Sequence, residues 1–267
     1  MAARSGTDPI VHARFGRDAA VLAVAVVLAA GQPASAHASA AEQVAARSWL
    51  AVRSAHLQVV TDAGRETAEK LAVRLEDLRT VLSLAAPALV VDVAPVQVIV
   101  FADPALAASY APRWNGQRDQ VSGFFQSAPD HGRLLFAADR SPVPGVAQHE
   151  YIHALLDAAM PGVPLWLNEG LASVLESDDL DWANRTVAEV GRMPSLQRLA
   201  APFATLSGGD AQLAYAASAV AVRRLLDQAG GVAIANLLRD LGEGIDFEKA
   251  FLHRIQKSLA DFEASLL

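Results

Sequence analysis

Residues 145–160 have the sequence GVAQHEYIHALLDAAM, which predicts a helix that ends at Pro161-Gly162. This segment lies near the middle of a 267-residue chain, where the sequence pattern changes. Before it, short alternating segments predict strands, and after it most apolar residues have helical spacing. We therefore expect an α+β fold, with a small mixed sheet and helices in an N-terminal lobe at residues 41–140. Helices alone should form a C-terminal lobe at residues 141–267.

The expected elements of the N-terminal lobe are short. An amphipathic stretch covers residues 41–52, and Thr61 or Asp62 is the expected N-cap of the first long helix. Strands are expected at residues 56–61, 95–101, 121–126 and 132–137, with helices at residues 62–84 and 104–110. In the C-terminal lobe, helices are expected at residues 145–160, 164–176, 210–229, 232–241 and 247–255, and a loop with helical turns at residues 178–198.

Composition excludes several functions. The net charge of −7 argues against nucleic acid as a partner, because neutralising phosphates requires a surplus of Lys and Arg. The chain has no cysteine, so disulfides, thiolate chemistry and Cys-ligated metals are excluded. Any bound metal must therefore be held by His, Asp and Glu.

The N-terminal segment, residues 1–36, is typical of a secretory signal peptide. A weakly basic lead precedes an unbroken apolar run at residues 19–30, and Ala34-Ser35-Ala36 forms a cleavage-type site. The run is short for a membrane span. We expect export to the periplasm or the medium of a bacterium, with an uncleaved membrane anchor as the alternative. A single domain at residues 41–267 would remain after cleavage.

The predicted central helix contains the motif H-E-x-x-H. His149 and His153 lie four residues apart, on one face of the helix and one turn from each other, so both imidazoles can bind one Zn²⁺. Glu150 lies on the adjacent face, where its carboxylate can accept a proton from a metal-activated water. The alternative is a pair of ordinary surface histidines. The apolar setting argues against it, because unpaired polar groups are costly there.

A catalytic zinc site usually has three protein ligands. Glu169, in the sequence Pro164-Leu165-Trp166-Leu167-Asn168-Glu169-Gly170-Leu171-Ala172, is the candidate third ligand, because a second helix packed antiparallel would close a triangle around the ion. Asp157 is the rival, one turn beyond His153 on the same helix. Asp157 would extend a line along one helix face, which favours Glu169.

These motifs resemble the gluzincin metallopeptidases, and more fully the peptidase MA-like domain of exported bacterial proteins. Beyond H-E-x-x-H and W-L-N-E-G-L-A, the resemblance includes Gly123-Phe124-Phe125 and Ala214-Tyr215-Ala216-Ala217-Ser218. It covers residues 48–267. Two family features are missing: Ser173 stands where thermolysin-like enzymes have an acid, which leaves His149 without an assigned partner, and the exopeptidase element G-x-M-E-N is absent.

The resemblance implies a zincin-type active-site helix and a role for each matching residue. His149, His153 and Glu169 would bind Zn²⁺, and Glu150 would act as the general base. Asn168 would support a zinc histidine through its other ring nitrogen. Tyr215 matches a downstream tyrosine that could stabilise an oxyanion. Its alternative is a buried tyrosine that bonds a backbone carbonyl.

The expected function is therefore a zinc metallopeptidase that hydrolyses peptide bonds in a peptide or protein substrate. The strand at residues 132–137, if it lies at the sheet edge, could pair with an extended substrate. Three alternatives stay open: a non-catalytic, zinc-stabilised extracytoplasmic binding module, a hydrolase of other bonds, and a relative that binds no zinc. The sequence does not indicate an oligomeric state.

Overall fold

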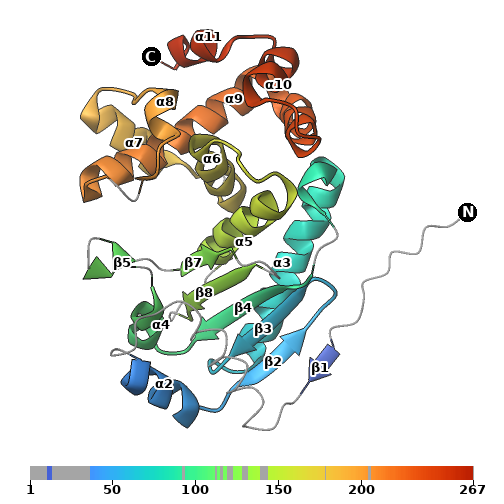
Figure 1. The fold of residues 1–267 in the computed structure, drawn as a ribbon, viewed down its shortest axis with the longest axis vertical. Helices are drawn as coiled ribbons and strands as arrows, with labels where there is room; N and C mark the ends of the chain where they lie inside the picture. The colour runs from blue at the N-terminus through green and yellow to red at the C-terminus, as the bar shows by residue number, and fades with distance from the viewer. Residues whose placement is uncertain are drawn as a thin grey trace, which may run out of the picture. The chain divides into compact units, whose positions relative to one another are not determined.

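The fold is α+β, as predicted (Figure 1). The computed structural model describes residues 11–13, 37–91, 94–111, 113–114, 117–118, 123–127, 132–138, 144–177, 179–203 and 206–266. The chain forms two compact units. The first comprises residues 1–77 and 93–147, and the second comprises residues 78–92 and 148–267. The unit boundary at residue 147 is close to the predicted lobe boundary at residue 140, but residues 78–92 were not expected to belong with the C-terminal helices.

A six-stranded mixed sheet organises the first unit. Its strand order is β1-β2-β3-β4-β8-β7, and β3, β4 and β8 are mutually parallel while β2 and β7 pair antiparallel to their neighbours. The strands are β1 (Val11–Ala13), β2 (Leu50–Arg53), β3 (Leu57–Thr61), β4 (Val96–Phe101), β7 (Gly123–Gln126) and β8 (Arg133–Ala137). A separate two-stranded pair joins β5 (Arg113–Trp114) to β6 (Gln117–Arg118).

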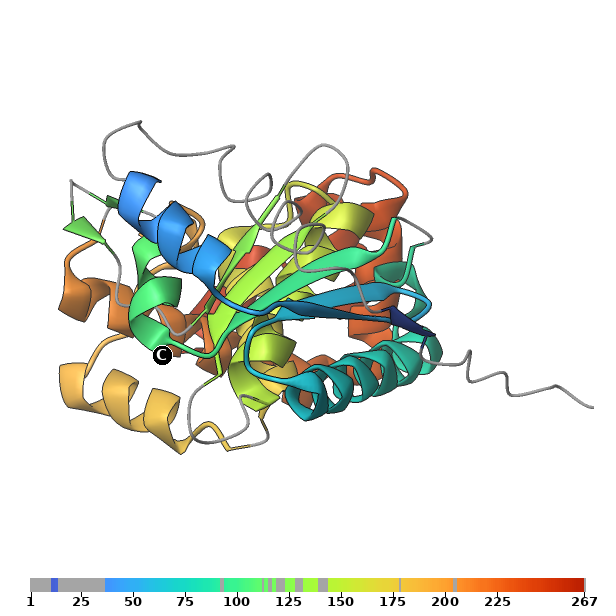
Figure 2. The same ribbon diagram turned by 90° about the horizontal axis from the view of Figure 1, so that it is seen from below.

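Alternate residues of each strand point to opposite sides of the sheet. Residues on both sides are buried. On one face, Val60, Ile99 and Leu135 pack in register with residues from α2 (His37–Ala46) and α4 (Pro104–Tyr110). On the other, Val59, Val98 and Leu134 are fully buried. Figure 2 shows α3 (Arg65–Ala85) lying along the sheet on the side away from α2. Continuous apolar strands are what a sheet covered on both sides requires.

The amphipathic stretch at residues 41–52 is divided between α2 and the strand β2. Two predictions for the first unit were wrong. Neither Thr61 nor Asp62 caps α3, since Thr61 Oγ1 accepts a hydrogen bond from the Ala63 amide and Asp62 accepts one from the Ala102 amide. The strand β8 is not an edge strand, because it pairs with β4 on one side and β7 on the other. Substrate pairing with β8 is therefore excluded.

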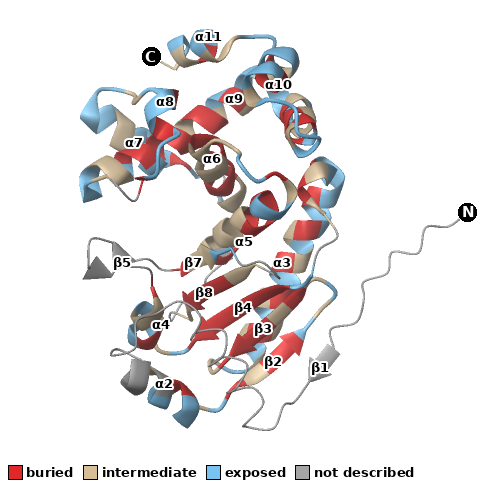
Figure 3. Cartoon of the chain, in the orientation of Figure 1, coloured by how far each residue is buried: buried red, intermediate tan, exposed pale blue. Residues whose placement is uncertain are grey.

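Helices make up the second unit. The packing of α6 (Leu165–Glu176) against α9 (Gly208–Gly242) forms its centre, and Figure 3 shows buried residues along α6 and the middle of α9. The helix α5 (Pro144–Ala159) begins in the first unit and continues into the second. The remaining elements are η1 (Pro87–Leu89), α7 (Asp181–Val190), α8 (Leu196–Leu199), α10 (Phe247–Ile255) and α11 (Leu259–Ala264).

Most helix predictions for the second unit are confirmed within a few residues. The predicted break near Gly230 is present, because Gly230 has φ 79° and ψ 158°, a conformation that interrupts α9. The prediction of a loop at residues 178–198 was wrong, since α7 occupies ten of these residues. Of the residues of α7 only Ala183 is buried, so this helix lies largely at the surface of its unit.

The predicted signal peptide, residues 1–36, lies outside the described residues except for β1, which pairs antiparallel with β2. Within the part of the chain that the structure describes, we find no helix with the length and apolar character needed to cross a bilayer. Export therefore stays a prediction.

Candidate metal centre

The helix α5 presents both predicted zinc histidines on one face. His149 and His153 lie one turn apart, with ring centroids separated by 4.7 Å and ring planes at 81°. Tyr151 and Ile152, between them in the sequence, are fully buried. This packing fixes the rotation of α5 about its axis, with Tyr151 and Ile152 on its buried side.

A short turn brings the third predicted ligand back to the histidines. The helix α5 ends near Met160, and Gly162 adopts a positive φ of 97° that few other residues tolerate. The helix α6 begins after Pro164, whose carbonyl accepts hydrogen bonds from the Leu167 and Asn168 amides. Glu169 lies in the second turn of α6, so its carboxylate reaches the histidine face of α5.

The three predicted ligands converge on one point. Oε2 of Glu169 lies 3.4 Å from Nε2 of His149 and 3.3 Å from Nε2 of His153. Ligand atoms bound tetrahedrally to one zinc ion at 2.0–2.1 Å would lie about 3.3–3.4 Å apart. All three donor atoms lie within 4.8 Å of one another, and this is the one such His, Cys, Asp and Glu group among the described residues. The donor set therefore fits Zn²⁺.

The Glu169 carboxylate is nearly buried, with a side chain 12% exposed. Its Oε2 atom has no hydrogen-bond donor with acceptable geometry among the described residues. Burial alone would raise the pKa of Glu169, but its interactions with the two imidazoles lower that pKa to about 2. A buried, ionised oxygen that faces two imidazole nitrogens is what a cation site requires.

The pKa values of the two imidazoles are raised, whereas that of Glu169 is lowered. Burial lowers the pKa of His149, but its interactions with the carboxylates of Glu169 and Glu176 outweigh burial and raise it to about 10. The pKa of His153 is also raised, because its interaction with Glu169 outweighs burial. Both shifts favour the protonated imidazoles, so a metal ion that binds at Nε2 must compete with a proton there.

Each histidine is held at its other ring nitrogen. Nδ1 of His153 lies 2.6 Å from Oδ1 of Asn168, and Nδ1 of His149 lies 3.0 Å from Oε2 of Glu176. With the imidazole N–H groups donating from Nδ1, both Nε2 atoms face Glu169 and are the atoms that a metal ion would bind. The structure thus places Asn168 in the supporting role that the sequence predicted for it.

Glu176 is the site residue that the sequence reasoning missed. It lies seven residues after Glu169, which is two turns along the same face of α6. The position four residues after Glu169 is occupied by Ser173, which is buried and carries no carboxylate. The signal that could have found Glu176 is this spacing of seven residues, which moves the acid one turn beyond the expected position.

Glu150 is half-buried on α5, beside the ligand cluster. Its negative charge contributes to the raised pKa of both His149 and His153. Asp157, the rival ligand, is exposed and does not belong to the cluster of donor atoms. The geometry therefore favours Glu169 over Asp157.

Tyr215 lies on the face of α9 that packs against α6. It precedes Ser218 by three residues and Val222 by seven, and these two residues meet Gly170 of α6. The Tyr215 ring makes an edge contact with Phe203 at 5.2 Å, and the residue is 39% exposed. It is therefore not the fully buried tyrosine of the alternative interpretation.

Gly170 sets the distance between α6 and α9. A Cβ atom at this position would overlap the carbonyl oxygen of Ser218 and the side chain of Val222. Only glycine allows the two backbones to approach this closely. Because Gly170 follows Glu169 directly, this contact also fixes where the third ligand stands.

Searches against protein-family models and against curated proteins found no match to this chain.

Proposed function

We propose that this protein is a zinc-dependent hydrolase, specifically a metallopeptidase. One observation carries the proposal: three side chains from two antiparallel helices bring two imidazole nitrogens to 3.4 and 3.3 Å from one buried carboxylate oxygen, with all three donor atoms within 4.8 Å of one another. The general-base candidate Glu150 adjoins the same site. Peptide bonds are proposed as the substrate class because of the resemblance of both motifs to gluzincins.

His149, His153 and Glu169 would hold the ion, and the fourth position would stay open. When bound, zinc acts as a Lewis acid and lowers the pKa of water in that position. Three protein ligands with total charge −1 leave a net positive site, which favours this acidification. Asn168 and Glu176 fix the ring orientation of the two histidines through Nδ1.

Glu150 supplies the proton transfers. Its carboxylate would take a proton from the attacking water and then deliver that proton to the nitrogen of the leaving amine. The Tyr215 hydroxyl would donate a hydrogen bond to the oxyanion that develops on the former carbonyl. The proposal includes export, as the segment at residues 1–36 indicates.

Two measurements test the proposal together. Metal analysis of the purified protein should give about one zinc per chain. A panel of casein, internally quenched peptides, ester and cell-wall substrates should show zinc-dependent turnover of the peptides, and Glu150→Gln should abolish that turnover while zinc is retained. Full zinc occupancy with no turnover in either protein would support a non-catalytic zinc-stabilised module instead. Absence of zinc would exclude both.

A further inference from the structure

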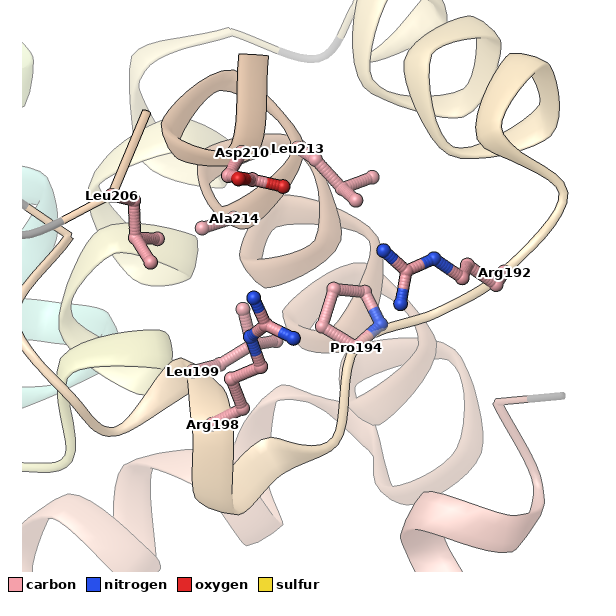
Figure 4. Close-up of a pocket in the computed structure, with 8 residues that line it drawn as sticks. All are labelled: Arg192, Pro194, Arg198, Leu199, Leu206, Asp210, Leu213 and Ala214. Carbon is pink, nitrogen blue, oxygen red and sulfur yellow. The ribbon is translucent and has the colours of Figure 1, made fainter. Parts of the chain in front are cut away.

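A surface pocket in the second unit contains two arginine side chains. It lies where the segment after α7 passes the beginning of α9, and its charged residues are Arg192, Arg198 and Asp210. Figure 4 shows both guanidinium groups turned toward the space between Pro194 and the first turns of α9. The proposed catalysis uses none of these residues, so the pocket needs a separate explanation.

Within the described part of this unit, the two guanidinium groups differ from other arginines in having no carboxylate partner. Arg254 makes two hydrogen bonds to Asp240, at 2.6 and 2.7 Å, and Arg185 lies 4.0 Å from Asp181. Among the residues that the structure describes, Arg192 and Arg198 have no carboxylate within 4.0 Å. Two unneutralised cations at one pocket attract a small anion.

The carboxylate of Asp210 does not neutralise this pair. Its Oδ2 accepts a hydrogen bond from the Ser207 hydroxyl at 2.7 Å, as part of the N-cap of α9. The formal charge of the pocket is therefore +1, from two arginines and one aspartate. A ligand with one negative group matches that charge. A polyanion would be repelled by Asp210 and by the net charge of −7 of the chain.

The remaining wall of the pocket is apolar. Leu199 is 1% exposed and Leu213 is 5% exposed, and Pro194 and Leu206 complete the lining. A ligand that fits both parts carries a carboxylate beside an apolar group. Arginine favours carboxylates because its planar donors can bond both oxygens at once.

The pocket also has a fixed relation to the proposed active site. Ala214 lines it, and Ser218, four residues further along α9, lies against Gly170, which follows the ligand Glu169. Four residues of α-helix rise by about 6 Å. Pocket and ligand helix are therefore joined by one turn of α9, and Tyr215 occupies that turn.

We infer that this pocket binds a carboxylate of a peptide substrate, with Arg192 and Arg198 on the carboxylate and the apolar wall against the neighbouring side chain. That the bound peptide is a substrate rests on the proposed function, whereas carboxylate binding by this pocket does not. The carboxylate could be the free C-terminus of the peptide or an acidic side chain within it. Either source presents the same two oxygens to the arginines.

Fluorescently labelled peptides separate these sources. The first is Ala-Ala-Leu-Leu with a free C-terminus, the second is the same peptide amidated, and the third is amidated Ala-Ala-Asp-Leu. Binding is measured by fluorescence anisotropy on the zinc-loaded full chain with Glu150→Gln, so that turnover does not interfere. We expect at least one carboxylate peptide to bind about fivefold or more tightly than the neutral amide.

The matched variants decide where the preference arises. The double substitution Arg192→Gln and Arg198→Gln should remove the preference, and Arg185→Gln, which deletes a charge on α7 outside the pocket, should keep it. Equal binding of all three peptides, or a preference that survives the double substitution, would overturn the inference. A preference that depends on the arginines in a protein without peptidase activity would leave the carboxylate pocket standing and refute only the proposed function.

Discussion

Glu176 accepts a hydrogen bond from Nδ1 of His149 at 3.0 Å, although it lies 27 residues further along the chain and on a different helix. It is the partner of His149 that the sequence left unassigned. The contact fixes the imidazole so that Nε2 faces Glu169. A single supporting carboxylate therefore serves a ligand on α5 from a position near the end of α6.

Replacing Glu176 should weaken zinc binding without removing a ligand. We expect Glu176→Gln to raise the dissociation constant for zinc about 10- to 100-fold, because His149 loses the negative charge that orients and polarises it. Competition with a chromogenic zinc chelator measures the constant. Glu189→Gln removes an exposed carboxylate on α7 and should leave it unchanged. Equal affinities for Glu176→Gln and wild type would show that this contact does not support the metal site.

Substitution of the two rival acids should identify the third ligand. Glu169→Gln should reduce zinc content from about one per chain to well below one half, since a neutral amide is a poor zinc ligand. Asp157→Asn should keep full zinc content, because Asp157 is exposed and outside the cluster. Elemental analysis after dialysis measures both. The reverse pattern would assign the ligand to Asp157.

Tyr215→Phe tests the proposed oxyanion donor. Removal of one such donor should lower kcat by about 10²–10³-fold with little change in zinc content, because the hydroxyl acts only as the oxyanion forms. Steady-state kinetics on a quenched peptide measure kcat and KM separately. Tyr110→Phe, in the first unit, is the control. A variant with unchanged kcat and a lower melting temperature would assign Tyr215 a packing role through Phe203.

Gly170→Ala should destabilise the second unit. The added methyl group would overlap the Ser218 carbonyl and Val222, so α6 and α9 must separate, at a cost of about 1–3 kcal/mol. We also expect weaker zinc binding, because Glu169 moves with α6. Urea denaturation measures the free energy of unfolding. Gly209→Ala is a matched control, since a Cβ there would meet nothing within 4 Å. Equal stability of both variants would contradict the close approach.

The ion pair between Asp240 and Arg254 should make stability depend on pH. Hydrogen bonding to Arg254 lowers the pKa of Asp240, so its stabilisation is fully present above the ordinary value of 3.8 and is lost as pH falls below it. Asp240→Asn should therefore lower the melting temperature at pH 7, and the difference from wild type should shrink toward pH 3. Exposed Asp227→Asn should have no such effect. A difference that does not vary with pH would contradict this assignment.

The local elements could be predicted from the sequence because their signals are local. The apolar spacing of α5 and the Pro161-Gly162 stop predicted that helix nearly to the residue, and α4 and α10 have the predicted bounds. The motif H-E-x-x-H placed two imidazoles on one helix face through the 3.6-residue period alone. Composition likewise excluded cysteine ligands.

Only the tertiary structure decided which partners complete the site. The chain reversal at Gly162 and the close contact at Gly170 bring Glu169 to the histidines and carry Glu176 to His149. Similarly, the pairing of β7 beyond β8 depends on contacts between strands, so a local pattern misassigned the sheet edge. The sequence determined the periodic arrangement of side chains along each element. Packing between elements, which depends on the whole chain, decided which of those side chains meet.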